Sequence, residues 1–151
     1  MLPTRRYGNP ISGKFFCFLV RGCCIYWRQE TGEGAAMELG NKKCIPCEGG
    51  ATTLPAGEVN RMLSQLSGWQ VEPGVSELRK RYKFASFLDT MAFVNRMAEL
   101  AEAEGHHPDF CVRYTNLDVS LTTHAIGGLS ENDFILAAKI EFLPKVVGVN
   151  L

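Results

Sequence analysis

Two pairs of alternating segments, each pair preceded by a helix-forming pattern, constrain the fold more than any other feature of the chain. The four segments cover residues 69–72, 78–84, 110–114 and 117–123. Alternation of apolar and polar side chains is typical of half-buried strands. The dividers Pro73-Gly74 and Thr115-Asn116 are short turn-forming sequences. The sequence therefore predicts two antiparallel hairpins.

Three helices are predicted around these hairpins. Val59, Met62, Leu63 and Leu66 have the spacing of one helix face ending near Gly68. Ser86 can cap a helix that runs to about Glu104, where Gly105 and Pro108 stop it. Ser130 and Asp133 form a capping box that opens a last helix before Pro144. The order predicts an α+β fold with two layers, a four-stranded antiparallel sheet and helices packed on one face.

The character of the chain changes near residue 36. Residues 1–36 are basic, carry no acid before Glu30 and show neither strand nor helix periodicity. They are interpreted as a leader, either a mis-assigned upstream start or a targeting segment, while residues 37–151 form one domain. The formal net charge of the whole chain is +0, so no nucleic acid or membrane-surface partner is expected. The apolar run at 15–20 is too short to span a bilayer.

The six cysteines lack the regular spacing of a disulfide framework and are interpreted as reduced thiols. Cys44 and Cys47 form a CxxC motif without a second pair, so one chain cannot build a closed zinc site from four thiolates. The motif lies in a Gly-rich segment ahead of the first predicted helix. A thioredoxin-type motif would instead follow a strand and open a helix. We expect a cytoplasmic protein, or an organellar one if residues 1–36 are a transit peptide.

All three histidines of the chain flank the second hairpin. With Thr115-Asn116 as its turn, the hairpin pairs Phe110 with Leu121 and would bring His107 opposite His124. A single histidine is more often structural than catalytic, but this cluster makes a proton-transfer or a metal site plausible. Adjacent histidines before Pro108 lack the i, i+4 spacing of helical zinc ligands, so no metal is expected.

An ordered set of motifs over residues 42–143 resembles the pterin-4a-carbinolamine dehydratase family. The motifs are Lys43–Cys47, Gly68-Trp69, Glu102, His106-His107-Pro108, Tyr114, Thr123-His124, Gly128-Leu129-Ser130 and Asp133. The resemblance implies a homodimer or homotetramer that dehydrates 4a-hydroxytetrahydrobiopterin to quinonoid dihydropterin during tetrahydrobiopterin recycling. It also implies that no cofactor is needed. Edge strands and the apolar last helix are a separate reason to expect assembly.

The resemblance also implies roles for individual residues. His106 and His124 are the candidate acid and base, while His107 holds the pterin; all three are candidate catalytic residues. Candidate substrate-binding residues are Trp69, Glu102, Thr123 and Asp133, although Asp133 also has a full structural account as the capping-box acid. Many members carry an acid where this chain has Gly105, so Glu102 or Glu104 must orient the histidines. The alternative function is a binding module of the same fold that stabilises a partner protein.

Overall fold

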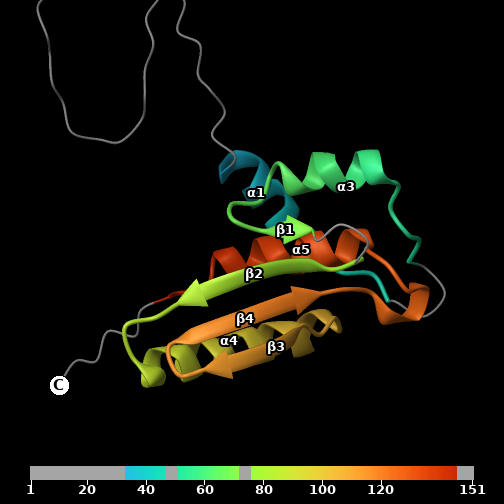
Figure 1. Ribbon diagram of the computed structural model, residues 1–151. Helices are drawn as coiled ribbons and strands as arrows, with labels where there is room; N and C mark the ends of the chain where they lie inside the picture. The colour runs from blue at the N-terminus through green and yellow to red at the C-terminus, as the bar shows by residue number, and fades with distance from the viewer. Residues whose placement is uncertain (1–32, 47–50, 72–75, 146–151) are drawn as a thin grey trace, which may run out of the picture.

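The computed structural model describes residues 33–46, 51–71 and 76–145, and the sheet lies at its centre (Figure 1). The antiparallel strands are arranged in the order β1-β2-β4-β3. Their bounds are Gln70–Val71 for β1, Leu78–Lys83 for β2, Asp109–Arg113 for β3 and Asn116–Leu121 for β4. In Figure 1, helices α4 (Phe87–Glu104) and α5 (Glu131–Glu141) lie behind the strands. The predicted α+β class is confirmed.

Local capping signals set the ends of the two long helices. The Ser86 hydroxyl oxygen accepts a hydrogen bond from the Asp89 N–H at 3.1 Å, so α4 begins directly after Ser86. Gly105 ends α4 in the left-handed region at φ 63°, which glycine adopts without a steric penalty. The predicted capping box of Ser130 and Asp133 opens α5. These predictions are confirmed.

The core lies between the sheet and α5. Leu78, Leu117 and Leu121 point from β2 and β4 toward the helices and are completely buried. On α5, Phe134, Ile135 and Ala138 are buried within the chain itself, whereas Phe142, directly after the helix, is 52% exposed. Most of the apolar surface of α5 that was expected to drive assembly is therefore already covered.

The predicted register of the second hairpin is wrong by two residues. Arg113 pairs with Asn116 and Phe110 with Val119, so the turn is Tyr114-Thr115, with Tyr114 at φ 57°. The cause is a contact outside the hairpin: the Thr115 carbonyl accepts from the Phe84 N–H at 2.9 Å. A shift of two preserves the faces of both strands, but the β3–β4 ladder ends at Asp109 and does not pair His107 with His124.

Three further segments complete the described fold. Helix α1 (Glu33–Gly40) contacts α5 and buries Leu39, so it crosses the predicted boundary between residues 36 and 37. Helix α3 (Ala56–Leu63) is the predicted first helix, and η1 (His124–Ile126) is a single 3₁₀ turn. Cys47 and Pro73-Gly74 lie outside the described residues. Within the described ranges, no helix combines the length and apolar character that crossing a membrane requires.

Candidate functional site

His106 forms a buried pair with the acid of the α5 capping box. Its Nε2 lies 2.8 Å from Asp133 Oδ1, and the two residues are only 4% and 0% exposed. The left-handed turn at Gly105 directs the chain off α4, so His106 enters the space beside the first turn of α5. An ionised carboxylate can only accept hydrogen bonds, so in a contact with ionised Asp133 the His106 Nε2–H is the donor.

The second oxygen of Asp133 connects this pair to the end of β4. Oδ2 accepts hydrogen bonds from the Ser130 N–H at 2.7 Å and from the Thr123 hydroxyl at 2.9 Å. Thr123 and Ser130 hydroxyls also lie 2.7 Å apart. One buried carboxylate therefore caps α5, holds His106 and fixes the residue that directly precedes His124.

His124 lies on the exposed side of the same region. Its Nε2 is 3.3 Å from Asp109 Oδ2, and both side chains are largely exposed. Asp109 opens β3 three residues after His106 and pairs with Ser120 of β4. The two strands therefore bring the segments 106–109 and 120–124 together at one end of the sheet.

His107 has a different environment from its neighbour. Its Nε2 lies 3.0 Å from Glu102 Oε2, with 63% of the His107 side chain and 84% of the Glu102 side chain exposed. Consecutive histidines thus point to opposite environments, one buried against Asp133 and one at the surface beside Glu102. Such a surface imidazole is open to contact a ligand.

The sequence offered Glu104 as a carboxylate that could orient the histidines, but Glu104 contacts other residues. Its carboxylate accepts from the Cys44 N–H at 3.0 Å and from Lys139 Nζ at 2.5 Å. Burial raises the pKa of Glu104, but these two donors outweigh burial and hold the pKa below its usual range. Asn132 binds the N–H and the carbonyl of Ile45 at 3.0 and 2.8 Å. Residues 44–45 are thus anchored to both elements that carry the His106–Asp133 pair.

Trp69 lies away from the histidines, at the other end of α5. Its indole N–H donates to Glu141 Oε1 at 3.0 Å, and the same oxygen accepts from Lys80 at 2.7 Å and Tyr82 at 2.6 Å. Burial raises the pKa of Glu141, but the hydrogen bonds from Lys80 and Tyr82 lower it by more than burial raises it. The pKa of Glu141 therefore lies below its usual range. Burial and then the bond to Glu141 raise the pKa of Tyr82. A pterin contact of Trp69 stays a prediction.

Of the predicted site residues, six lie in the histidine region: His106, His107, His124, Glu102, Thr123 and Asp133. The sequence reasoning missed Asp109, whose position three residues after His106 was the available signal. It also treated Asp133 and His106 separately, because their contact is tertiary. Across the described ranges, no three His, Cys, Asp or Glu side chains are grouped so as to hold a metal ion. Metal-independent catalysis stays a prediction.

Comparisons with known proteins identify the family of this chain. Residues 52–143 match the family model described as pterin 4 alpha carbinolamine dehydratase. A protein of Halorhodospira halophila assigned to these dehydratases is 44% identical over 107 residues, which cover 71% of this chain and 98% of that protein. One of Nitrosospira multiformis with the same assignment is 47% identical over 106 residues, covering 70% and 92%.

A solved structure is similar in fold as well as in sequence. The crystal structure of a transcriptional coactivator/pterin dehydratase from Brucella melitensis superposes with a TM-score of 0.58 at 33% identity. The match covers 60% of this chain and 96% of the other. The chain therefore belongs to the pterin-4a-carbinolamine dehydratase family.

Proposed function

We propose that this protein dehydrates 4a-hydroxytetrahydrobiopterin to quinonoid dihydropterin and water, as part of tetrahydrobiopterin recycling. The observation that carries the proposal is the Asp133 carboxylate, which joins His106 to Thr123 directly beside His124. Two imidazoles at the same end of the sheet, each beside a carboxylate, suit a reaction that moves two protons near neutral pH. Family membership supports the same chemistry.

The reaction breaks the C4a–oxygen bond and forms a double bond between C4a and N5. The leaving hydroxyl needs a proton to depart as water, and N5 must lose its proton to a base. We assign these two steps to His106 and His124. Asp133 holds the His106 ring in one orientation and stabilises its protonated form, while Asp109 does the same for His124 at the surface.

His107 and Glu102 have a binding role in this proposal. Both side chains are exposed and lie next to each other at the C-terminal end of α4. They can therefore contact the pterin ring without moving a buried group. A contact of this kind stabilises the ground state and the transition state to similar extents, so it acts on KM more than on kcat.

The decisive experiment is a dehydratase assay on the purified protein, with carbinolamine generated by a pterin-dependent hydroxylase. We expect quinonoid dihydropterin to form faster than in the spontaneous reaction, which is subtracted. Chelation should leave the rate unchanged. A rate equal to the spontaneous one in a folded sample would refute the proposal, and loss of activity on chelation that zinc restores would refute the metal-free mechanism.

A second candidate function is binding to a partner protein, since the similar Brucella protein is described as a coactivator as well as a dehydratase. An exposed apolar group supports this candidate: Phe87 stacks on Tyr114 at 6.4 Å between ring centroids, beside the 78% exposed Leu88. A stable complex with a partner, in a protein without dehydratase activity, would favour the module over the enzyme.

Assembly, location and domain limits complete the proposal. Edge strand β3 carries the half-exposed Phe110, which supports a homodimer or homotetramer that sedimentation would detect. The free thiol of the exposed Cys111 suits a reducing compartment such as the cytoplasm. Catalysis is assigned to residues 37–151, so deleting residues 1–36 should leave folding and turnover unchanged.

A further inference from the structure

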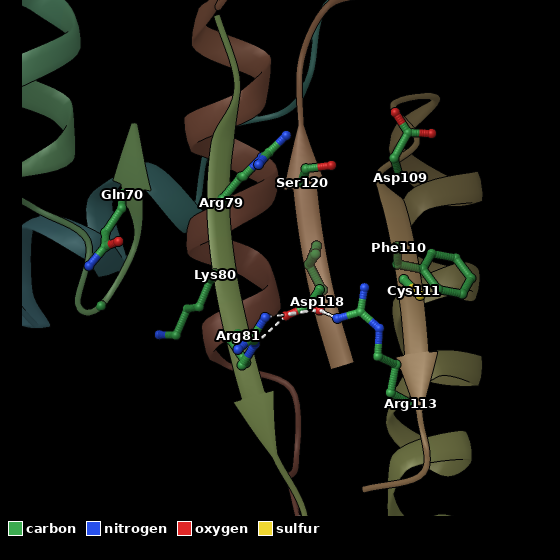
Figure 2. A pocket seen from close by; sticks show the side chains of 12 residues that line it. Gln70, Arg79, Lys80, Arg81, Asp109, Phe110, Cys111, Arg113, Asp118 and Ser120 are labelled. Atoms are coloured by element: carbon green, nitrogen blue, oxygen red, sulfur yellow. Dashed lines mark hydrogen bonds and ion pairs between the residues drawn. The ribbon is translucent and has the colours of Figure 1, made fainter. Parts of the chain in front are cut away.

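The sheet face opposite α4 and α5 is hollowed next to the histidine region. The hollow has a volume of about 720 Å³ and is lined mainly by polar side chains of the four strands, together with Phe110, Val119 and Gly68 (Figure 2). Asp109 belongs to its lining and also contacts His124. The hollow and the proposed catalytic region are therefore continuous, with Asp109 as the shared side chain.

Strand pairing orders this face into rows. Asp109 pairs with Ser120, which pairs with Arg79, and these residues form the row nearest the histidines. Asp118 lies in the next row, two residues along β4, which is about 6.8 Å away at the usual rise per residue. A ligand held at His124 can therefore reach Asp118 and its partners with a short substituent.

Two arginines share the carboxylate in this second row. Arg81 of β2 donates Nε to Asp118 Oδ1 and Nη2 to Oδ2 at 3.3 Å. Arg113 of β3 donates Nη1 to the same Oδ2 at 2.6 Å. Figure 2 shows both guanidinium groups directed at Asp118 from opposite sides. The bond from Arg81 lowers the pKa of Asp118, so the group of three carries a net charge of +1 at neutral pH.

The stability of the sheet does not explain why a second arginine contacts Asp118. One guanidinium neutralises one carboxylate, and exposed ion pairs contribute little to stability. Each guanidinium has five N–H donors, so the bonds to Asp118 leave donors on both. On the strand positions of this face, four bases (Arg79, Arg81, Lys83 and Arg113) face two acids (Asp109 and Asp118), and Glu77 beside β2 pairs with Arg79 at 2.8 Å, which leaves an excess of one positive charge. Residues 37–151 together carry 11 bases and 14 acids, so the positive charge is local.

We propose that this hollow holds the C6 substituent of the pterin and that Arg81 and Arg113 select a substituent carrying a phosphate or a carboxylate. The inference rests on the proposed dehydratase function. C6 is bonded to N5, the atom that loses a proton, so the substituent starts at the histidines and extends away from the reacting bond. The open face beyond Asp109 is the adjoining hollow, and two guanidinium forks match the geometry of an anionic terminus.

Binding of stable dihydropterins tests this inference. 7,8-Dihydroneopterin and its 3′-phosphate differ only in the phosphate, and dihydrofolate carries a p-aminobenzoylglutamate chain in place of the phosphorylated triol. We expect the full-length protein to bind the phosphate ester roughly ten-fold more tightly than the neutral pterin, with a preference that salt weakens. Comparison of the phosphate ester with dihydrofolate then distinguishes a phosphate from a carboxylate as the preferred terminus.

The variants Arg81→Gln and Arg113→Gln, alone and combined, should remove this preference stepwise and leave affinity for the neutral pterin unchanged. Each single variant keeps one guanidinium on Asp118, and thermal unfolding checks that it folds. Arg61→Gln is the matched control, because Arg61 is an exposed arginine paired with Glu58 on α3. Equal wild-type affinity for neutral and anionic pterins, or a preference that survives the double variant, would overturn the inference. Neither result would contradict the proposed dehydratase function. Absence of both pterin binding and turnover in the wild-type protein would contradict that function itself.

Discussion

The two ends of α5 each hold a carboxylate surrounded by donors, and they differ in what those donors are. At the N-terminal end, Asp133 accepts from the Ser130 N–H, the Thr123 hydroxyl and the His106 imidazole. At the C-terminal end, Glu141 accepts from Trp69, Lys80, Tyr82 and Lys145. Eight residues separate the two acids, or about 12 Å along the helix.

Only the first of these ends has an imidazole among the donors to its carboxylate. Imidazole titrates in this range, whereas lysine, tyrosine and indole keep their protons throughout it. At the C-terminal end of α5, donors with fixed protonation link the sheet and the segment after the helix to Glu141. A titratable donor at the same kind of carboxylate adds the ability to transfer a proton. Donor identity, rather than burial of the acid, separates the reactive end from the structural end.

The largest expected effect is on turnover at the N-terminal end. Asp133→Asn keeps the size and a capping oxygen, but a neutral amide cannot stabilise the protonated His106 ring. We expect kcat to fall by about 10²- to 10⁴-fold, as also for His106→Ala or His124→Ala. Steady-state kinetics with the spontaneous rate subtracted measures this. Undiminished turnover in the His106→Ala/His124→Ala double variant would remove the proposed chemistry.

Glu141→Gln is the matched change at the C-terminal end. It leaves Lys80 and Lys145 without their carboxylate, so the free energy of unfolding should fall by about 1–3 kcal/mol. The kcat per folded molecule should stay at the wild-type value, because no titrating donor is lost. Urea unfolding and the dehydratase assay on the same preparation test both statements. A large fall in kcat here would break the distinction between the two ends.

Lowering the pH tests the stabilising role of Glu141, because the pKa of this carboxyl is lowered in the folded protein. The ordinary value is 4.5 and the folded value lies below it, so the stabilisation is fully present above pH 4.5. It is lost as the pH falls through the folded pKa. The difference in unfolding free energy between wild type and Glu141→Gln should therefore shrink below pH 4.5. Denaturant unfolding between pH 7 and 3 measures it, and a constant difference would contradict the assignment.

The smallest effect is expected at the exposed pair of His107 and Glu102. His107→Ala should raise KM by up to about ten-fold while kcat changes little, because an exposed contact contributes about 1.4 kcal/mol at most. Glu102→Gln should have a smaller effect in the same direction. If His107→Ala abolished turnover while His124→Ala retained it, the roles of the two exposed histidines would have to be exchanged.

The sequence predicted those parts of the fold that depend on neighbouring residues. The ends of α4 follow from Ser86 and Gly105, and the start of α5 follows from its capping box, because each signal acts within one turn. The hairpin register was wrong because a bond between Thr115 and Phe84 of another segment decides it. Helix α1 was missed for the same reason, since Leu39 is buried against distant parts of the chain.

The same distinction between local signals and contacts of distant residues applies to the candidate site. The clustering of the histidines was visible in the sequence, but the partner of each histidine was not. His106 contacts Asp133 across 27 residues, and His124 contacts Asp109 because two strands end together. The carboxylate expected to orient the histidines was Glu102 or Glu104, and Glu102 lies beside His107. Lys139 and Cys44 occupy Glu104 instead, which only the packed structure determines.

The left-handed turn at Gly105 makes the histidine pair sensitive to chain length as well as to composition. It ends α4 one residue before His106, so that His106 faces inward and His107 faces outward. Inserting one residue between His107 and Asp109 should move His107 to the position, three residues before β3, that His106 now holds beside Asp133. The identity of the imidazole beside Asp133 therefore depends on the number of residues between Gly105 and β3, and not only on the presence of two histidines.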